Sequence, residues 1–224
     1  MKSATQSYTR RDFLRGTSGA ALTALAFPAI VPSSALGQNE AVAPSSRILV
    51  GCIGTGPQGR GVMGNFLSRK DCQVVAVCDV KTDSLGRARD QVNQAYGNQD
   101  VKTYARFEEV LARKDIDVVL IATPDHWHVP VAVAAAKAGK DMYVEKPLGI
   151  SVEEDQILRK TLKKHERLFQ FGTQQRSDNQ FWRACEMVRA GRIGQLQHID
   201  VWCSASQPGG STTPVKPPPE IDYD

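Results

Sequence analysis

The sequence has few cysteines, few aromatic residues and no long uninterrupted apolar run. Its five cysteines are scattered without a C-x-x-C pair, which argues against a disulfide framework or a zinc site, so we expect no metal. A net charge of +4 is mild, and no basic segment is interleaved with aromatic residues, so we expect no nucleic-acid partner. The apolar stretches are too short for a stable membrane span.

Apolar residues nevertheless make up 41% of the 224 positions, enough to build the core of one large domain or about one and a half. From Arg47 onward, apolar runs alternate with helical patterns. The expected strands are 48–53, 73–79, 101–104, 117–122, 141–144 and 168–171, and the expected helices include 84–96, 107–113, 129–138 and one starting at the capping box Ser151 to Glu154. Repeated strand-helix units predict an α/β fold with a Rossmann-like, doubly wound parallel sheet.

The composition changes after Gly172. A polar loop at 173–177 precedes an expected helix at 179–190 and an expected strand at 196–203, and a Ser, Gly and Pro-rich stretch follows. One helix and one strand cannot bury each other's apolar faces as an independent domain. We therefore interpret 173–224 as the start of a truncated α+β substrate domain, after a nucleotide-binding domain at 44–172.

Three glycines after the first expected strand have the spacing G-x-G-x-x-G. The first, Gly54, permits a tight turn; Gly56 lets the backbone approach a pyrophosphate; and Gly59 lets helix and strand pack closely. The N–H groups at the start of the following helix attract phosphates. The predicted cofactor-binding segment also includes Thr55, Gln58 and Arg60.

The second expected strand ends at Asp79, about 20 positions beyond these glycines, as in dinucleotide-binding proteins. Its carboxylate can accept hydrogen bonds from an adenosine ribose and repel a 2′-phosphate, which favours NAD. Alternatively, Asp79 caps the helix that begins near Asp83. NADP stays an alternative cofactor because Arg60 or Lys81 could reach a 2′-phosphate.

Residues 1–43 have the layout of an export signal and linker. A basic segment with Arg10 and Arg11 precedes an apolar run at 19–31 and a region of small residues. The paired arginines followed by Asp-Phe-Leu resemble the twin-arginine motif, so we expect a periplasmic, exported protein cleaved between Leu36 and Ser45. The alternative is a basic tail before an unrelated apolar helix.

Ligands of open α/β sheets bind beyond the carboxyl ends of the strands, where the glycine turn, 123–128 and 145–147 are expected to meet. Lys146 could accept the proton of a substrate hydroxyl, or it could pair with Glu145 or bind phosphate. His128 is a second polar candidate, although a histidine at a helix start often serves capping or packing. His126 is a weaker candidate.

Several of these segments, taken in order, resemble the Gfo/Idh/MocA oxidoreductase family. The resemblance covers about 48–202 and rests on Ala122-Thr123-Pro124, His128, the alanine-rich helix, Ala138-Gly139-Lys140 and Glu145-Lys146-Pro147. It implies that Lys146 is catalytic and, with Glu145, close to the cofactor. By the same resemblance Thr123, Pro124 and His128 line the nicotinamide, and Gln175 and Arg176 contact cofactor and sugar.

Family members continue for well over a hundred residues and supply a catalytic aspartate and histidine that nothing here matches. The resemblance therefore implies an exported NAD(P)-dependent oxidoreductase acting on a sugar, sugar acid or cyclitol, with this chain alone expected to be inactive. Alternatives are an NAD-dependent glycoside hydrolase of related fold, or a non-catalytic dinucleotide-binding fragment. The expected partners are a small carbohydrate substrate and, at full length, further copies of the same protein.

Overall fold

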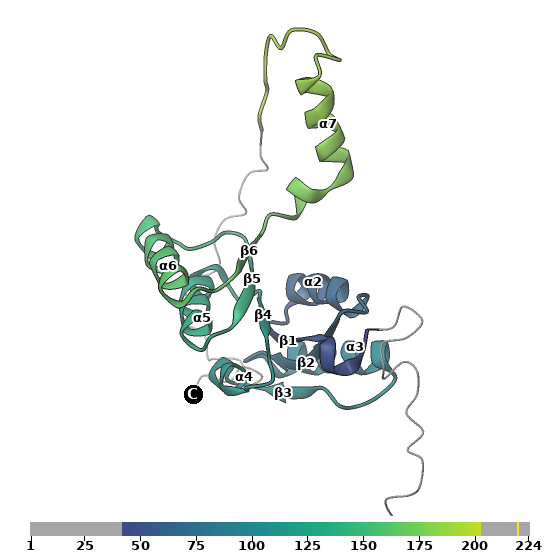
Figure 1. The fold of residues 1–224 in the computed structure, drawn as a ribbon, viewed down its shortest axis with the longest axis vertical. Coiled ribbons are helices and arrows are strands. Elements are labelled where there is room, and N and C mark those ends of the chain that lie inside the picture. The colour runs from purple at the N-terminus through teal and green to yellow at the C-terminus, as the bar shows by residue number, and fades with distance from the viewer. Residues whose placement is uncertain (1–41, 203–218, 220–224) are drawn as a thin grey trace, which may run out of the picture. The chain divides into compact units, whose positions relative to one another are not determined.

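A computed structural model describes residues 42–202 and 219 (Figure 1). The predicted twin-arginine motif and most of the export signal lie outside the described residues. Contacts divide the chain into residues 1–45 and residues 46–224. A short 3-10 helix, η2 (Pro44–Ser46), comes first, and everything described below belongs to the second unit. None of the helices in the described part is long and apolar enough to cross a membrane.

Six parallel strands form one sheet with the order β3-β2-β1-β4-β5-β6. Each predicted strand between residues 48 and 172 is present within one or two residues. Their bounds are β1 (Ile48–Ile53), β2 (Cys72–Cys78), β3 (Lys102–Tyr104), β4 (Val118–Ile121), β5 (Asp141–Glu145) and β6 (Phe169–Gly172). The predicted doubly wound α/β fold is thereby confirmed.

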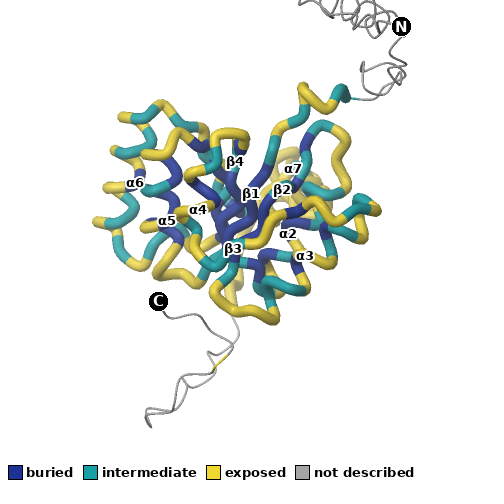
Figure 2. The backbone as a smooth tube through the Cα atoms, turned by 90° about the horizontal axis from the view of Figure 1, so that it is seen from below, coloured by how far each residue is buried: buried dark blue, intermediate teal, exposed yellow. Residues whose placement is uncertain are grey.

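Helices cover both faces of this sheet (Figure 1). One buried cluster joins the strands to α2 (Pro57–Leu67) and α3 (Thr82–Tyr96). The other cluster joins them to α4 (Phe107–Ala112), α5 (Asp125–Lys137) and α6 (Val152–His165). Figure 2 shows the buried positions gathered along the strands and the helix faces turned toward them. Because both faces are covered, the central strands β1, β2 and β4 are nearly continuous apolar runs.

Local sequence signals explain the start of α6 and the end of α3. At the start of α6, the Ser151 side chain accepts a hydrogen bond from the Glu154 backbone N–H at 3.3 Å. The Glu154 carboxylate accepts from the Ile150 N–H at 3.1 Å, one residue earlier than a regular capping box requires. Gly97, with a φ of 67°, ends α3 in the left-handed conformation that glycine adopts without steric cost.

The predicted loop 123–128 is wrong for its last four residues. α5 begins at Asp125 instead of Val129, so residues 125–128 form its first turn. Pro124 stands immediately before the helix with a φ of −58°, and its carbonyl accepts from the Trp127 N–H at 2.8 Å. Proline fixes this backbone angle and lacks an N–H, which suits a helix start. Pro130 lies inside the helix and lacks the N–H that would bond to the carbonyl four residues earlier.

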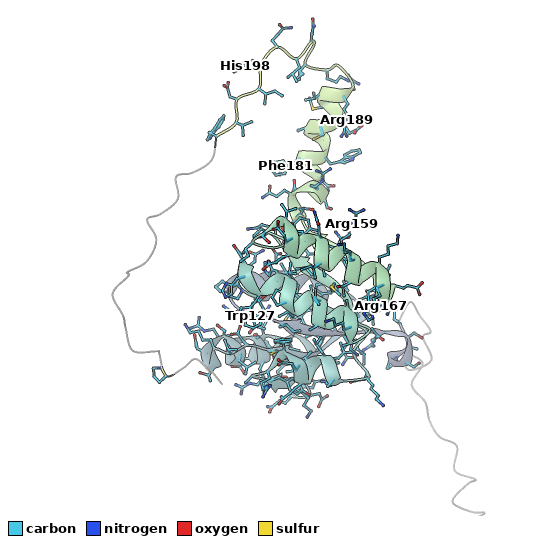
Figure 3. The ribbon with its side chains drawn as sticks, turned by 90° about the vertical axis from the view of Figure 1, so that its left-hand side faces the viewer. Trp127, Arg159, Arg167, Phe181, Arg189 and His198 are labelled. Carbon is cyan, nitrogen blue, oxygen red and sulfur yellow. The ribbon has the colours of Figure 1, made fainter. Side chains whose placement is uncertain are left out.

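The predicted strand at 196–203 is also wrong over its described part. Residues 195–202 have no strand, and Cys203 lies outside the described residues. The segment follows η3 (Gln174–Ser177) and α7 (Asn179–Arg189). Figure 3 shows Phe181 and Arg189 extending from α7, and Phe181 is 55% exposed. A strand needs a neighbour to satisfy its backbone hydrogen bonds, and no described residues pair with this segment.

Candidate functional site

The glycine turn connects β1 to α2 and leaves room for side chains at only one of its three glycines. Gly54 has a φ of 82°, and a Cβ atom there would lie 2.5 Å from the carbonyl carbon of Ala122. At Gly59 a Cβ atom would collide with the carbonyl oxygen of Gly54. By contrast, nothing lies within 4 Å of a Cβ atom built at Gly56. The fold thus requires the first and third glycines, and the second faces open space.

The same turn presents the N-terminus of α2. Arg60 is the first residue whose N–H bonds within the helix, to the Gly56 carbonyl at 3.0 Å, so the N–H groups before it have no helical partner. These donors and the helix dipole favour a phosphate group. The Arg60 guanidinium bonds the Thr55 carbonyl at 2.7 Å and so folds over the turn.

Asp79 follows β2 directly and holds the glycine turn. Its Oδ2 accepts from the Thr55 N–H at 2.7 Å and from the Thr55 hydroxyl at 3.1 Å, while Oδ1 accepts from the Lys81 N–H at 2.8 Å. Of the four acceptor positions of a carboxylate, this leaves one on Oδ1. The alternative role as cap of the next helix is wrong, because α3 begins at Thr82 with Lys81 as its N-cap.

A pocket of about 240 Å³ lies at the carboxyl ends of β4 and β5. It is lined by Gln58, Ala122, Thr123, Asp125, His128, Glu145 and Lys146. Five of these are predicted site residues. Asp125 also lines the pocket and is missed by sequence reasoning; its position directly after Thr123-Pro124 is the signal that could have found it. Lys146 is exposed.

His128 is buried, and its Nδ1 lies 2.6 Å from the carbonyl oxygen of Pro147, the residue after Lys146. A carbonyl only accepts, so Nδ1 carries the hydrogen. Nε2 of His128 and the hydroxyl of Thr123 are buried without a hydrogen-bond partner among the described residues. Buried polar atoms are nearly always satisfied. These two belong to pocket-lining residues, so they suit a ligand with polar groups.

Glu145, the last residue of β5, is only 2% exposed. Its Oε1 accepts from the side-chain amides of Gln58, at 3.3 Å, and of Gln174, and its Oε2 accepts from the Lys146 N–H at 3.3 Å. Gln174 is a second residue that sequence reasoning missed. Its signal was its place just after β6, at the same sheet edge.

The charge of this carboxylate affects the pKa of the neighbouring Tyr143. Burial raises the pKa of the Tyr143 hydroxyl, the negative charge of Glu145 raises that pKa further, and a hydrogen bond with Gln174 opposes both. The predicted Gln175 and Arg176 lie in η3, are exposed and do not line the pocket. Pro124 precedes α5 and is exposed rather than part of the lining.

No group of three or more His, Cys, Asp or Glu side chains in residues 42–202 or at 219 is arranged to hold a metal ion. A dinucleotide fits the residues present: a helix N-terminus and an open Gly56 for phosphates, a spare acceptor on Asp79 for a ribose, and a polar pocket at the next strand ends. Together with the strand order, this arrangement defines a dinucleotide-binding Rossmann domain.

The chain belongs to the Gfo/Idh/MocA family, whose model, described as "Oxidoreductase family, NAD-binding Rossmann fold", matches residues 48–173. The predicted family and the predicted cofactor, NAD, are therefore confirmed. The preference against NADP stays a prediction.

Curated relatives include a "Glycosyl hydrolase family 109 protein" of Stenotrophomonas maltophilia (strain K279a), 33% identical over 177 residues, which are 76% of this chain and 39% of the relative. A protein of the same name from Saccharopolyspora erythraea is 32% identical over 213 residues, covering 87% of this chain and 45% of the relative. The chain thus spans less than half the length of these relatives.

Solved structures with the same fold include inositol dehydrogenases. Myo-inositol 2-dehydrogenase from Lactobacillus plantarum is 26% identical, with a TM-score of 0.60 over 66% of this chain and 43% of that one. Scyllo-inositol dehydrogenase from Lactobacillus casei, solved with bound NAD(H) and scyllo-inositol, is 26% identical with a TM-score of 0.59, over 66% of this chain and 42% of that one.

Proposed function

We propose that this chain is the nucleotide-binding part of an exported NAD-dependent oxidoreductase that acts on a sugar, sugar acid or cyclitol. The observation that carries the proposal is the single pocket in which Lys146, His128 and Glu145 meet at the ends of β4 and β5. Bound NAD supplies the hydride acceptor or donor, at C4 of its nicotinamide. The chain's own residues then have to hold the cofactor and manage the proton of the substrate hydroxyl.

Lys146 is the residue that we assign to this proton. Its neighbours in sequence are fixed: Glu145 by amide donors and the Pro147 carbonyl by His128. Lys146 itself is exposed and lines the pocket, so its ammonium group is available to a substrate. An amine that gives up its proton can accept the proton of a hydroxyl during oxidation and return it during reduction. Gln175 and Arg176 are proposed to contact the substrate from η3.

A ring-shaped polyol is the substrate class that we favour. Support comes from the two inositol dehydrogenases with the same fold, one of them solved with scyllo-inositol. We further propose the division into an export segment at 1–43, a nucleotide-binding domain at 44–172 and the beginning of a substrate domain from 173, with the full-length protein a homo-oligomer.

The test separates binding from turnover. The 224-residue chain is expected to bind NAD in isothermal titration calorimetry but to show no steady reduction of NAD with inositols or sugars, whereas a longer protein containing it turns over. In that longer protein, Lys146→Ala should lower kcat by roughly 10² to 10⁴, the range for a lost acid–base group. Lys160→Ala, at an exposed position on α6, serves as the control. Full activity of Lys146→Ala would contradict the assignment.

A second candidate is an NAD-dependent glycoside hydrolase, in which the cofactor is reduced and reoxidised within one turnover. The specific observation in its favour is the name of the curated relatives, glycosyl hydrolase family 109, at 32–33% identity. An aryl glycoside distinguishes the two candidates. Release of the aryl alcohol that requires NAD but accumulates no NADH favours the hydrolase; accumulation of NADH with a free polyol favours the dehydrogenase. Neither reaction, with NAD binding intact, favours a non-catalytic dinucleotide-binding module.

Export is proposed from the sequence of residues 1–43 alone. Replacing Arg10 and Arg11 by Lys should leave the protein in the cytoplasm, as measured by cell fractionation and immunoblotting. Arg15→Lys, in the same basic segment but outside the pair, is the matched control and should be exported normally. Normal export of the double variant would rule out the twin-arginine route.

A further inference from the structure

Glu145 is a buried carboxylate that only accepts hydrogen bonds. Its three described partners are the amide groups of Gln58 and Gln174 and the backbone N–H of Lys146, all of them donors. A protonated carboxyl would need an acceptor for its own hydrogen, and none is found for it in the described part of the chain. The contacts therefore fit the ionised form.

Among the described residues, no cationic side chain lies within ion-pair distance of this charge. No ion pair between described residues involves Glu145, although its side chain is almost entirely removed from water. A buried charge without a counter-charge is costly, and such costs are tolerated where a ligand supplies the missing charge.

The whole pocket carries an excess of negative charge. Two carboxylates, Glu145 and Asp125, line it together with one ammonium group, that of Lys146. These three groups sum to one negative charge. The nicotinamide ring of NAD⁺ carries a positive charge and that of NADH carries none, and the two cofactor forms are otherwise alike in their charged groups.

We propose that this pocket selects the oxidised cofactor, with Glu145 as the residue that sets the preference and with Gln58 and Gln174 as positioning residues that hold its charge in place. The inference rests on the proposed function, because it requires the nicotinamide to occupy this pocket. Gln58 belongs to α2 and Gln174 to η3, so two segments 116 positions apart hold one carboxylate.

The expected size follows from the Coulomb interaction of a unit charge a few ångströms away. At a separation of about 6 Å this interaction changes the affinity by about threefold where water screens the charges and by about a hundredfold where the protein does. We therefore expect this chain to bind NAD⁺ more tightly than NADH. The ratio of the two dissociation constants depends on the charge at residue 145, whereas a change in overall affinity alters both constants alike.

The experiment measures dissociation constants of NAD⁺, NADH and ADP-ribose by calorimetry for the 224-residue chain and three variants. Glu145→Gln should lower the preference for NAD⁺ by about threefold or more. Asp125→Asn, at an exposed position that leaves the core intact, should lower it in the same direction by less. Lys146→Met should raise it. ADP-ribose lacks the nicotinamide, so its affinity controls for damage to the rest of the site.

A merely structural role for Glu145 would weaken NAD⁺ and NADH equally and leave the ratio unchanged. An unchanged ratio in Glu145→Gln, or tighter binding of NADH by the unaltered chain, would overturn the inference while leaving the proposed function intact. Failure of the unaltered chain to bind either form would overturn both. If Glu145→Gln does not fold, as judged by circular dichroism, Asp125→Asn and Lys146→Met decide the question by the opposite signs expected of them.

Discussion

The Nδ1 atom of His128 lies 2.6 Å from the carbonyl oxygen of Pro147 and joins the first turn of α5 to the turn after β5. Lys146 is the residue before this carbonyl. Because His128 is buried, the bond anchors the exposed turn to the interior of the domain. The position of the Lys146 backbone is thus determined by residues from two different strand-helix units.

Replacement of His128 tests this bond. His128→Phe keeps a ring in the buried site but removes the donor to the Pro147 carbonyl. Because water can reach this exposed turn, we expect the loss of one net hydrogen bond, about 0.5–1.5 kcal/mol in the free energy of unfolding. Urea unfolding followed by circular dichroism measures it. His126→Phe, an exposed neighbour in the same turn, should stay within about 0.5 kcal/mol of the unaltered protein. Equal stability of His128→Phe and the unaltered chain would count against the bond.

Two variants of the glycine turn are expected to affect different properties, one the stability of the fold and the other the affinity for NAD. Gly54→Ala forces an unfavourable φ of 82° and a clash with Ala122, so we expect a loss of at least about 1–3 kcal/mol in unfolding free energy. Gly56→Ala meets open space and should unfold like the unaltered chain. Its added methyl group instead stands where the phosphates approach, so NAD affinity should fall by roughly tenfold, about 1.4 kcal/mol. Normal NAD binding by Gly56→Ala would contradict the proposed phosphate position.

Asp79 is expected to favour NAD over NADP. Asp79→Ser should narrow the gap between the two affinities by on the order of 1 kcal/mol or more, the worth of a charge-assisted hydrogen bond. Since Asp79 also holds Thr55, the matched control is Thr55→Val, which loses only the 3.1 Å hydroxyl bond and should change both affinities alike. Calorimetric titration with each cofactor gives the comparison. Equal binding of NAD and NADP by the unaltered chain would show that Arg60 or Lys81 attracts the 2′-phosphate as strongly as Asp79 repels it.

Alkaline pH should destabilise the domain through its buried thiols. Burial, reinforced by the charge of Asp79, raises the pKa of Cys78 to about 12, and burial raises that of Cys52 as well. In the unfolded chain a thiol has a pKa of about 8.5. A raised folded-state pKa means that the stabilisation is complete below about pH 8.5 and is lost as the pH rises toward 12.

Each buried thiol should therefore lower the unfolding free energy by about 1.4 kcal/mol per pH unit above pH 8.5, or about 2 kcal/mol by pH 10. Urea unfolding at pH 7, 8, 9 and 10 measures the slope. Tyrosines and lysines also titrate in this range, so the informative quantity is the difference from Cys78→Ala, whose slope should be shallower. Identical slopes for the two proteins would show that Cys78 is not responsible.

The amino-acid sequence by itself determined the strands, most of the helices, the glycine turn and the family. These features depend on local patterns: apolar runs of strand length, a helical period after each, and glycines at fixed spacing next to Asp79. The segment 196–203 shows the limit of such patterns. Its apolar residues are typical of a strand, but a strand forms only when another strand offers its backbone, and residues 42–202 offer none.

Only the tertiary structure decided how the site is assembled. Gln174 reaches Glu145 because β6 lies beside β5 in the sheet, and Gln58 reaches the same carboxylate because β1 and β5 both flank β4. His128 contacts Pro147 because α5 begins four residues earlier than its sequence indicated. Each of these contacts joins residues between 19 and 87 positions apart. Such partners are selected by the order in which strands pair and helices pack, and a local sequence pattern carries no information about that order.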